Sequence, residues 1–244
     1  MRTLSASDLL TVWEQGFGQN PVDQALCVLG VWTGEPREEL AALSIGERDA
    51  RLFDIYEYLF GPELEAFADC PACGERLEYR LSTRDLKQRR SSPEGSDVLD
   101  LTSADVSLRL RLPNSMDLTA ARECANPAEA RRMLAERCVV EAMRDFRVIP
   151  PQSLPDGAVD AISSHLAQAD PLAEVLVGLE CLECRHSTQI MLAIEQFLWT
   201  KIVWLAKRLL REVDVLARVY GWSEREILSL SAVRRERYLE MATS

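Results

Sequence analysis

Two Cys-x-x-Cys pairs constrain this chain of 244 residues more than any other feature. The first pair is Cys70 and Cys73, the second is Cys181 and Cys184, and residues 74–180 separate them. Each such turn directs its two sulfurs to one side, and two turns supply the four thiolates of a tetrahedral zinc site. A long intervening loop is compatible with a shared site because loop closure costs only logarithmically more as the loop lengthens. The pattern therefore predicts one structural zinc ion, bound by all four cysteines.

Two other interpretations of the cysteines stay open: a redox dithiol, or two unrelated pairs without metal. A thioredoxin-type dithiol is expected at the start of a helix in a βαβ context, which neither pair has. Four thiolates fill a zinc ion's coordination shell, so we expect a closed structural site and not a catalytic one. Whether His186, two residues after Cys184, contributes to the metal site is left open.

The composition narrows the classes of partner. Lys+Arg number 28 and Asp+Glu 39, a net charge of −11, so the chain repels phosphate backbones and nucleic acid is not expected as a partner. The first residues, MRTLSASDLL, lack the features of a signal peptide, and no apolar run approaches the roughly 18 residues of a membrane span. We therefore expect a cytoplasmic protein without a membrane partner, in which seven cysteines are not a disulfide framework.

The sequence contains few of the residues and motifs that catalysis commonly uses. It contains no GxSxG, no phosphate-binding Gly-rich loop and no HExxH, and it has only two histidines. We therefore expect no catalytic residues and no enzymatic activity.

The hydrophobic periodicity is mostly helical, with a few alternating segments typical of strands. Ser44, followed by Glu47, has the pattern of a capping box and predicts a helix that ends before Gly61-Pro62. The other expected helices are 7–15, 21–32, 116–123, 128–146, 158–168, 195–219, 224–230 and 232–241, and the expected strands are 77–81, 106–112, 172–180 and 187–194.

These elements predict an α+β fold that is mostly helical, with a four-cysteine zinc ribbon interrupted by a long α/β insertion. We expect four parts along the chain. They are N-terminal helices (1–66), a split zinc ribbon (67–84 plus 172–194), an inserted strand–helix subdomain (85–171) and a C-terminal helical arm (195–244).

The C-terminal arm carries the residue types expected of a partner-binding surface. Its long helix has two neighbouring apolar stripes, which together are wider than the single stripe that a surface helix needs to cover one core. The arm also carries large aromatic residues beside arginines, and these residue types are enriched at interface hot spots. The candidate partner-binding residues are Trp199, Trp222, Arg234, Arg235 and Arg237. The alternative is internal packing, in which Trp222 staples its helix–helix corner and the N-terminal helices cover the second stripe.

Stretches at both ends of the chain and around the first cysteine pair add a resemblance. They are LLTVWEQG (9–16), PVDQALCVLG (21–30), LSIGERDARLFDI (43–55), FGPELEAFADCPACGERLEY (60–79), FLW (197–199), RLLREVDVLARVYGWSEREILSLS (208–231) and RRERYLE (234–240). Together they resemble a family of baseplate assembly proteins from contractile phage tails and phage-tail-like injection systems, often labelled baseplate hub assembly chaperones. The second knuckle departs from the family pattern because Arg185 and His186 stand where a glycine and an aromatic are expected.

The resemblance implies a non-enzymatic baseplate assembly factor or baseplate component of a contractile phage-tail-like particle, acting by binding other baseplate or tail proteins. It specifies neither the oligomeric state nor whether the protein stays in the finished particle. Two alternatives come from other classes. One is a zinc-ribbon regulator that binds transcription machinery or nucleic acid, and the other is a redox or metal-dependent enzyme.

Overall fold

The computed structural model describes residues 4–88, 98–103 and 105–242. They form two compact units, which we describe separately: residues 1–37 with 195–244, and residues 38–194. Helices predominate among the described residues and the strands pair antiparallel, which confirms the predicted α+β, mostly helical class. None of the helices in the described part of the chain combines the length and the apolar composition needed to cross a bilayer. The predicted division into four parts stays a prediction.

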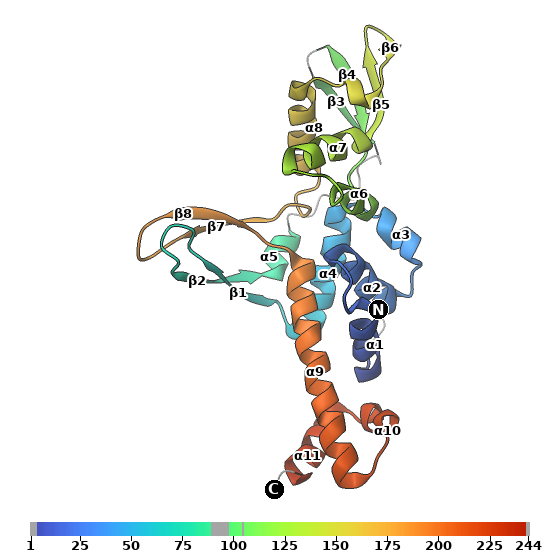
Figure 1. Ribbon diagram of the computed structural model, residues 1–244, viewed down its shortest axis with the longest axis vertical. Coiled ribbons are helices and arrows are strands. Elements are labelled where there is room, and N and C mark those ends of the chain that lie inside the picture. The colour runs from blue at the N-terminus through green and yellow to red at the C-terminus, as the bar shows by residue number, and fades with distance from the viewer. Residues whose placement is uncertain (1–3, 89–97, 104, 243–244) are drawn as a thin grey trace. The chain divides into compact units, whose positions relative to one another are not determined.

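The first unit consists of five helices (Figure 1): α1 (Ala6–Gly16), α2 (Pro21–Thr33), α9 (Ile194–Tyr220), α10 (Glu224–Ser229) and α11 (Ala232–Ala242). Ser5 caps α1 and Asn20 caps α2, each by accepting hydrogen bonds from backbone N–H groups of the first turn. Leu10 of α1 packs with Ala206 and Leu209 of α9 in the buried core of this unit.

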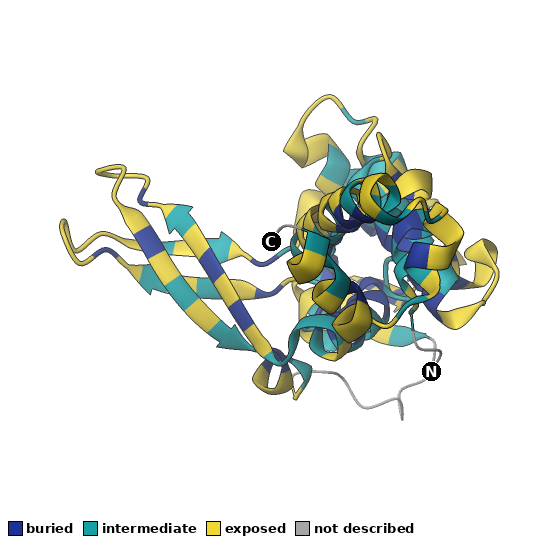
Figure 2. Cartoon of the chain, turned by 90° about the horizontal axis from the view of Figure 1, so that it is seen from below, coloured by how far each residue is buried: buried dark blue, intermediate teal, exposed yellow. Residues whose placement is uncertain are grey.

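The described residues of the second unit form six α-helices and the short 3-10 helix Pro151–Ser153. The α-helices are α3 (Arg37–Ala42), α4 (Ile45–Phe60), α5 (Thr83–Lys87), α6 (Ser115–Ala121), α7 (Pro127–Cys138) and α8 (Asp156–Ala169). Its strands form two separate hairpins and one larger sheet. The hairpins are β1 (Glu63–Asp69) with β2 (Arg76–Ser82), and β7 (Leu176–Glu180) with β8 (Ser187–Met191). Along the hairpins, exposed residues alternate with more buried ones (Figure 2), as a strand with one covered face requires.

The larger sheet has the strand order β3-β4-β5-β6, with β3 (Leu99–Ser103), β4 (Val106–Leu110), β5 (Val139–Arg144) and β6 (Arg147–Val148), all antiparallel. Inward-facing strand residues such as Leu108 and Ala142 pack with Ala135 of α7 and Ile162 of α8 in a buried cluster. The sheet therefore has its own small core against α7 and α8.

One predicted helix is wrong, and four strands of the described structure, β1, β3, β5 and β6, were not predicted. The helix expected over 128–146 ends at Cys138, and β5 begins at Val139. The β-branched pair Val139-Val140 favours a strand, and pairing with β4 satisfies its backbone. Residues 63–69, expected only as a lead-in to the first cysteine, form β1 because they pair along their whole length with β2.

Two buried carboxylates connect separate segments of the second unit. Asp170, at the end of α8, accepts a 2.8 Å hydrogen bond from the backbone N–H of Gly46 in the first turn of α4. Asp117 of α6 accepts hydrogen bonds from the guanidinium groups of Arg111 and Arg137. Both are therefore paired, as buried carboxylates must be to avoid a large desolvation cost.

Candidate metal centre

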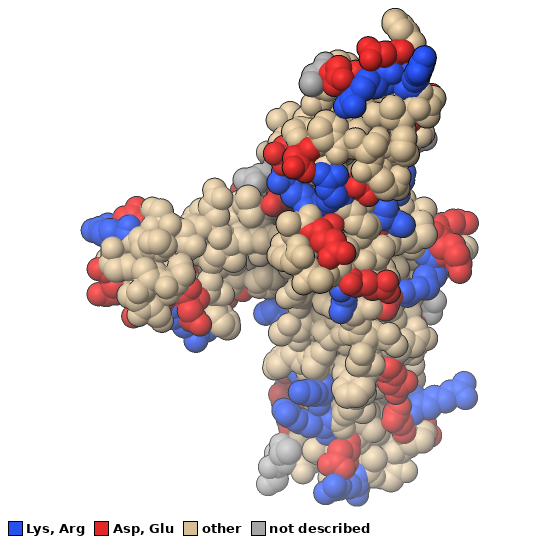
Figure 3. Space-filling view, turned by 45° about the horizontal axis from the view of Figure 1, so that its top comes forward, with Lys and Arg blue, Asp and Glu red and all other residues tan. Residues whose placement is uncertain are grey.

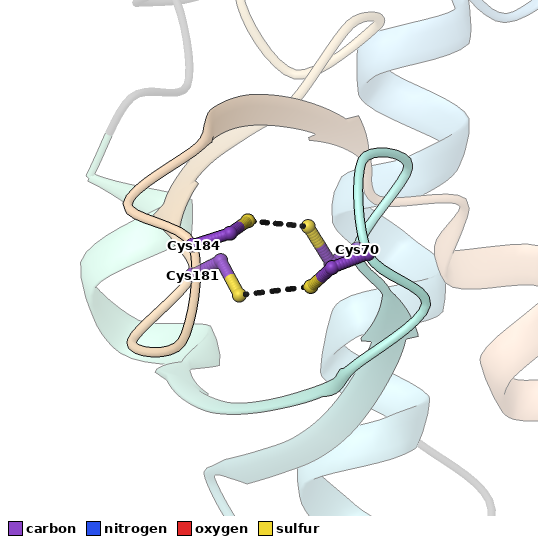
Figure 4. Close-up of side chains that lie close together, drawn as sticks. Cys70, Cys181 and Cys184 are labelled. Atoms are coloured by element: carbon purple, nitrogen blue, oxygen red, sulfur yellow. Dashed lines mark hydrogen bonds between the residues drawn. The ribbon is translucent and has the colours of Figure 1, made fainter.

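Both cysteine pairs lie in hairpin turns. Cys70 and Cys73 occupy the turn between β1 and β2, and Cys181 and Cys184 the turn between β7 and β8. The two turns face each other, with the sulfurs directed into the space between them (Figure 4). Neither pair begins a helix, which is the position that a thioredoxin-type dithiol occupies.

The two turns have the same backbone hydrogen bonds. The N–H of Cys70 donates to the carbonyl of Glu75, and the N–H of Gly74 donates to the carbonyl of Cys70, both at 2.8 Å. In the second turn, the N–H of Cys181 donates to the carbonyl of His186, and the N–H of Arg185 donates to the carbonyl of Cys181, both at 2.9 Å. The two knuckles are therefore structurally equivalent.

The equivalence extends to a left-handed residue after each second cysteine. Gly74 has φ +75°, and Arg185 has φ +60° at the corresponding position. An arginine in this region is unfavourable because its Cβ approaches the backbone, whereas glycine has no such cost. The replacement of the expected glycine by Arg185 thus changes the local energy but not the shape of the turn.

The sulfur positions fit a zinc ion. Sγ of Cys70 lies 3.7 Å from that of Cys184, and Sγ of Cys73 lies 3.6 Å from that of Cys181. All four sulfurs lie within 4.8 Å of one another. A tetrahedron with Zn–S bonds of about 2.3 Å has edges of about 3.8 Å. The observed separations therefore match the donor set and size of a Cys₄ zinc site.

The environment of the sulfurs also favours a bound cation. The side chains of Cys70 and Cys181 are buried beside Leu77 and Leu179, whereas Cys73 and Cys184 are exposed. Hydrogen bonds from the backbone N–H groups of Ala72 and Cys73 lower the pKa of the Cys70 thiol to about 7. In the same turn the backbone N–H of Glu75 lowers the pKa of the Cys73 thiol, but the neighbouring Cys184 sulfur and burial raise it to about 12. Several thiolates this close together therefore require a cation to offset their repulsion.

The remaining cysteines and histidines lie outside this cluster. Cys27, Cys124 and Cys138 are separate free thiols, and burial raises the pKa of the Cys138 thiol to about 12. His186 takes part through its backbone carbonyl, which accepts from Cys181. Among the described residues, the cluster of potential metal ligands consists of the four cysteines.

The predicted partner-binding residues differ in their surroundings. The Trp199 ring lies against Gly16 of α1, where an added Cβ would come within 2.4 Å of it. The Trp222 ring stacks on Tyr220 and meets Tyr238 edge-on, with ring centroids 4.7 and 4.8 Å apart. These contacts match the internal packing that the sequence left as the alternative.

The three arginines of α11 also differ among themselves. Arg235 is buried, where its Nε lies 3.0 Å from a carboxylate oxygen of Glu212 and its Nη1 donates to the carbonyl of Leu230. Arg234 is exposed, and Arg237 is exposed and paired with Glu240. A role of these residues in partner binding stays a prediction.

The surface charge bears on the alternative of a nucleic-acid-binding regulator. On the face shown in Figure 3, acidic and basic side chains are interspersed. That distribution differs from the clustered Lys and Arg side chains that track a phosphate backbone.

Comparison with known proteins gives one match. The family model described as T4 bacteriophage base plate protein matches residues 27–199, more than half of the chain, and the matched range contains all four clustered cysteines. No curated protein and no solved structure matches the chain.

Proposed function

Because this chain belongs to the T4 bacteriophage base plate protein family, we propose that it is a non-enzymatic baseplate component or assembly factor of a contractile phage-tail-like particle. It acts by binding other baseplate or tail proteins, and a zinc ion stabilises the scaffold that presents its binding surfaces. The observation that carries the proposal is the family match over residues 27–199. The four-sulfur geometry supports the zinc.

The zinc ion joins two distant parts of the second unit. The β1–β2 and β7–β8 hairpins belong to separate sheets, and the described residues between them contain helices and the larger sheet. The apolar contact under the sulfurs is small, with Leu77 and Leu179 as its main aliphatic members. Structural zinc contributes roughly 10–16 kcal/mol of apparent binding free energy in small peptides. A bound ion is therefore the dominant connection between the two turns.

Non-enzymatic action is supported by the donor set. Four thiolates complete a tetrahedron and leave no position for a substrate or an activated water molecule. Partner binding by the C-terminal helices remains part of the proposal. It rests on Arg234 and Arg237, which are exposed, more than on Arg235, whose contacts are internal.

The proposal is tested by complementing a producer strain that lacks this gene. Wild-type chain and a Cys181→Ser variant are compared for zinc content by mass spectrometry and for assembled particles by electron microscopy. We expect Cys181→Ser to lose zinc, thermal stability and particle formation. The matched control is Cys124→Ser, because this thiol lies outside the cluster, and it is expected to behave like wild type.

Two results would contradict the proposal separately. Normal particles in the absence of the gene would refute the role in the baseplate. Zinc-free wild-type protein that melts like Cys181→Ser would refute the zinc scaffold.

A further inference from the structure

The solvent-exposed side of α9 combines an aromatic ring with positive charges. The ring is that of Trp204, which is 59 % exposed. Residues three, four or seven positions apart lie on the same face of a helix. At these spacings from Trp204, α9 has four exposed cations: Lys201, Lys207, Arg208 and Arg211. We call Trp204 and these four cations the basic face of α9. None of them is among the partner-binding residues predicted from the sequence.

Most cations of the basic face have no counter-ion. Among the described residues, no carboxylate forms an ion pair with Lys201, Lys207 or Arg211. Arg208 lies 2.9 Å from a carboxylate oxygen of Glu212, and its guanidinium is 5.9 Å from the centroid of the Trp204 ring. Lys207 and Arg211 are four positions apart, and like charges at this spacing destabilise a helix. The helix therefore has an unneutralised cationic face that local stability does not explain.

The charges around the basic face do not supply the missing anions. The two acidic residues of the nearby turns are already paired, Glu212 with Arg208 and Arg235, and Asp214 with Arg218. The first unit contains 11 basic and 11 acidic residues, so the second unit carries the whole net charge of −11. The basic face is therefore complementary to carboxylates that another molecule supplies.

A lipid surface does not fit the helix that carries this face. Ile202, Ala206 and Leu209 are buried, and the last two pack with Leu10 of α1. A helix that lies in a membrane interface needs its apolar side to enter the bilayer. In α9 that side already forms the core of its own unit.

A nucleic acid fits the basic face less well than a short acidic segment does. Lys201 and Arg211 are ten positions apart, about 15 Å along the helix axis. The net charge of −11 repels a phosphate polymer in proportion to the many charges of that polymer. A short protein segment carries few charges, and an apolar side chain within it can cover the Trp204 ring.

From these observations we propose that the basic face of α9 binds an acidic segment of another protein of the particle. This inference rests on the proposed function, because it specifies the kind of partner that the chain binds. Carboxylates of the segment pair with Lys201, Lys207 and Arg211, and an apolar side chain packs on the Trp204 ring. Tryptophan and arginine are the residue types that dominate many protein interfaces.

The test is fluorescence anisotropy of a labelled synthetic peptide titrated with the purified, zinc-loaded chain. The probe is a peptide of about 18 residues, long enough to form a helix in water, with glutamates along one face and a leucine between them. We expect a dissociation constant of about 1 mM or tighter, which rises with salt concentration. A matched peptide with glutamine in place of each glutamate is expected to bind at least about tenfold more weakly.

Three variants identify the residues that bind the peptide. Trp204→Ala removes the ring and is expected to weaken binding at least about tenfold. Lys207→Gln and Arg211→Gln each remove one cation, and each is expected to weaken binding about two- to fivefold. All three positions are exposed, so we expect unchanged zinc content and melting temperature.

Two matched controls remove similar side chains elsewhere in the first unit. Arg225→Gln removes an exposed cation of α10, and Phe17→Ala removes an exposed ring at the end of α1. Both are expected to bind the peptide like wild type. A second measurement complements the strain that lacks the gene. We expect Lys207→Glu/Arg211→Glu to abolish particle formation, whereas Arg225→Glu supports normal assembly.

Three results would overturn the inference. One is a wild-type chain that does not bind the acidic peptide, including one that binds phosphatidylglycerol vesicles or single-stranded oligothymidine instead. Another is peptide binding that Trp204→Ala and Arg211→Gln leave unchanged, or that Arg225→Gln weakens equally. The third is normal assembly with Lys207→Glu/Arg211→Glu. The baseplate role itself fails by a different result, normal particles in the absence of the gene, so the two proposals are distinguishable.

Discussion

The contact between Gly46 and Asp170 predicts that Gly46→Ala destabilises the chain when Asp170 is present and stabilises it when Asp170 is replaced by alanine. Asp170 is 6 % exposed and accepts the Gly46 N–H at 2.8 Å. A Cβ added at Gly46 would lie 1.7 Å from Oδ1 of Asp170 and 2.5 Å from its Cγ. These distances are far below van der Waals contact, so Gly46→Ala must displace the carboxylate that caps α4.

The magnitude follows from two opposing effects. A hydrogen bond to a charged group contributes about 1.5–3 kcal/mol, and displacing Asp170 loses it. Replacing glycine by alanine in a helix returns about 0.5–1 kcal/mol. Gly46→Ala alone should therefore cost about 1.5 kcal/mol. In an Asp170→Ala background the same substitution meets no carboxylate and should stabilise the chain by up to about 1 kcal/mol.

The assay is a double-mutant cycle of chemical and thermal unfolding on the zinc-loaded chain. For a unit of roughly 150 residues, about 1.5 kcal/mol corresponds to a shift in melting temperature of about 3–6 °C. Far-UV circular dichroism is the appropriate signal, because the five tryptophans all belong to the other unit: Trp13, Trp32, Trp199, Trp204 and Trp222. If Gly46→Ala cost the same with and without Asp170, the two effects would be additive and the reasoning from the close contact would fail.

Three further predictions concern other contacts. Burial alone would raise the pKa of Asp117, but hydrogen bonds from Arg111, the Asn114 backbone and Arg137 hold it below its ordinary value. The ionised Asp117 therefore contributes its full stabilisation above about pH 4, and this contribution is lost as the pH falls through the lowered pKa of the folded state. Asp117→Asn should cost about 2–3 kcal/mol at pH 7. It should also flatten the acid limb of a stability–pH curve. Arg235→Ala should cost about 2 kcal/mol in urea titrations because it removes the buried partner of Glu212, whereas exposed Arg234→Ala should change stability by less than about 0.5 kcal/mol. Zinc removal by a chelator should lower the melting temperature of the second unit, followed by far-UV circular dichroism, while the tryptophan emission of the first unit stays native-like. Simultaneous loss of both signals would show that zinc also stabilises the first unit.

Local sequence signals predicted the parts of the fold that depend on neighbours in the chain. Ser44 accepts from the N–H of Glu47 at the start of α4, as its spacing predicted. Each cysteine pair lies in its own turn, as its spacing predicted, whereas the meeting of the two turns joins residues 114 and 108 positions apart and was predicted only from the four ligands that zinc requires. Val139 was misassigned because the helical spacing of α7 runs on into a strand whose partner, β4, precedes that helix in the sequence.

Contacts between distant residues were not predictable from spacing. Gly46 reads as an ordinary helix residue until Asp170, 124 positions later, is placed against it. Similarly, Phe146 falls at the end of the helix that was expected over 128–146. Only the hairpin, which depends on β4 and β5 pairing, shows it as an exposed ring at a turn.

The order of the two cysteine pairs along the chain has a consequence for synthesis. A ribosome adds about 5–20 residues per second, so Cys184 is added several seconds or more after Cys73. During that interval only two of the four sulfurs of the site are present, and neither thiol has the complete donor set that would bind a zinc ion and protect it. The nascent chain is then open to oxidation and to capture of a thiophilic metal such as Cu(I). We therefore expect the yield of zinc-loaded protein to depend on the redox state and copper content of the producing cell, more than on those of the buffer used later.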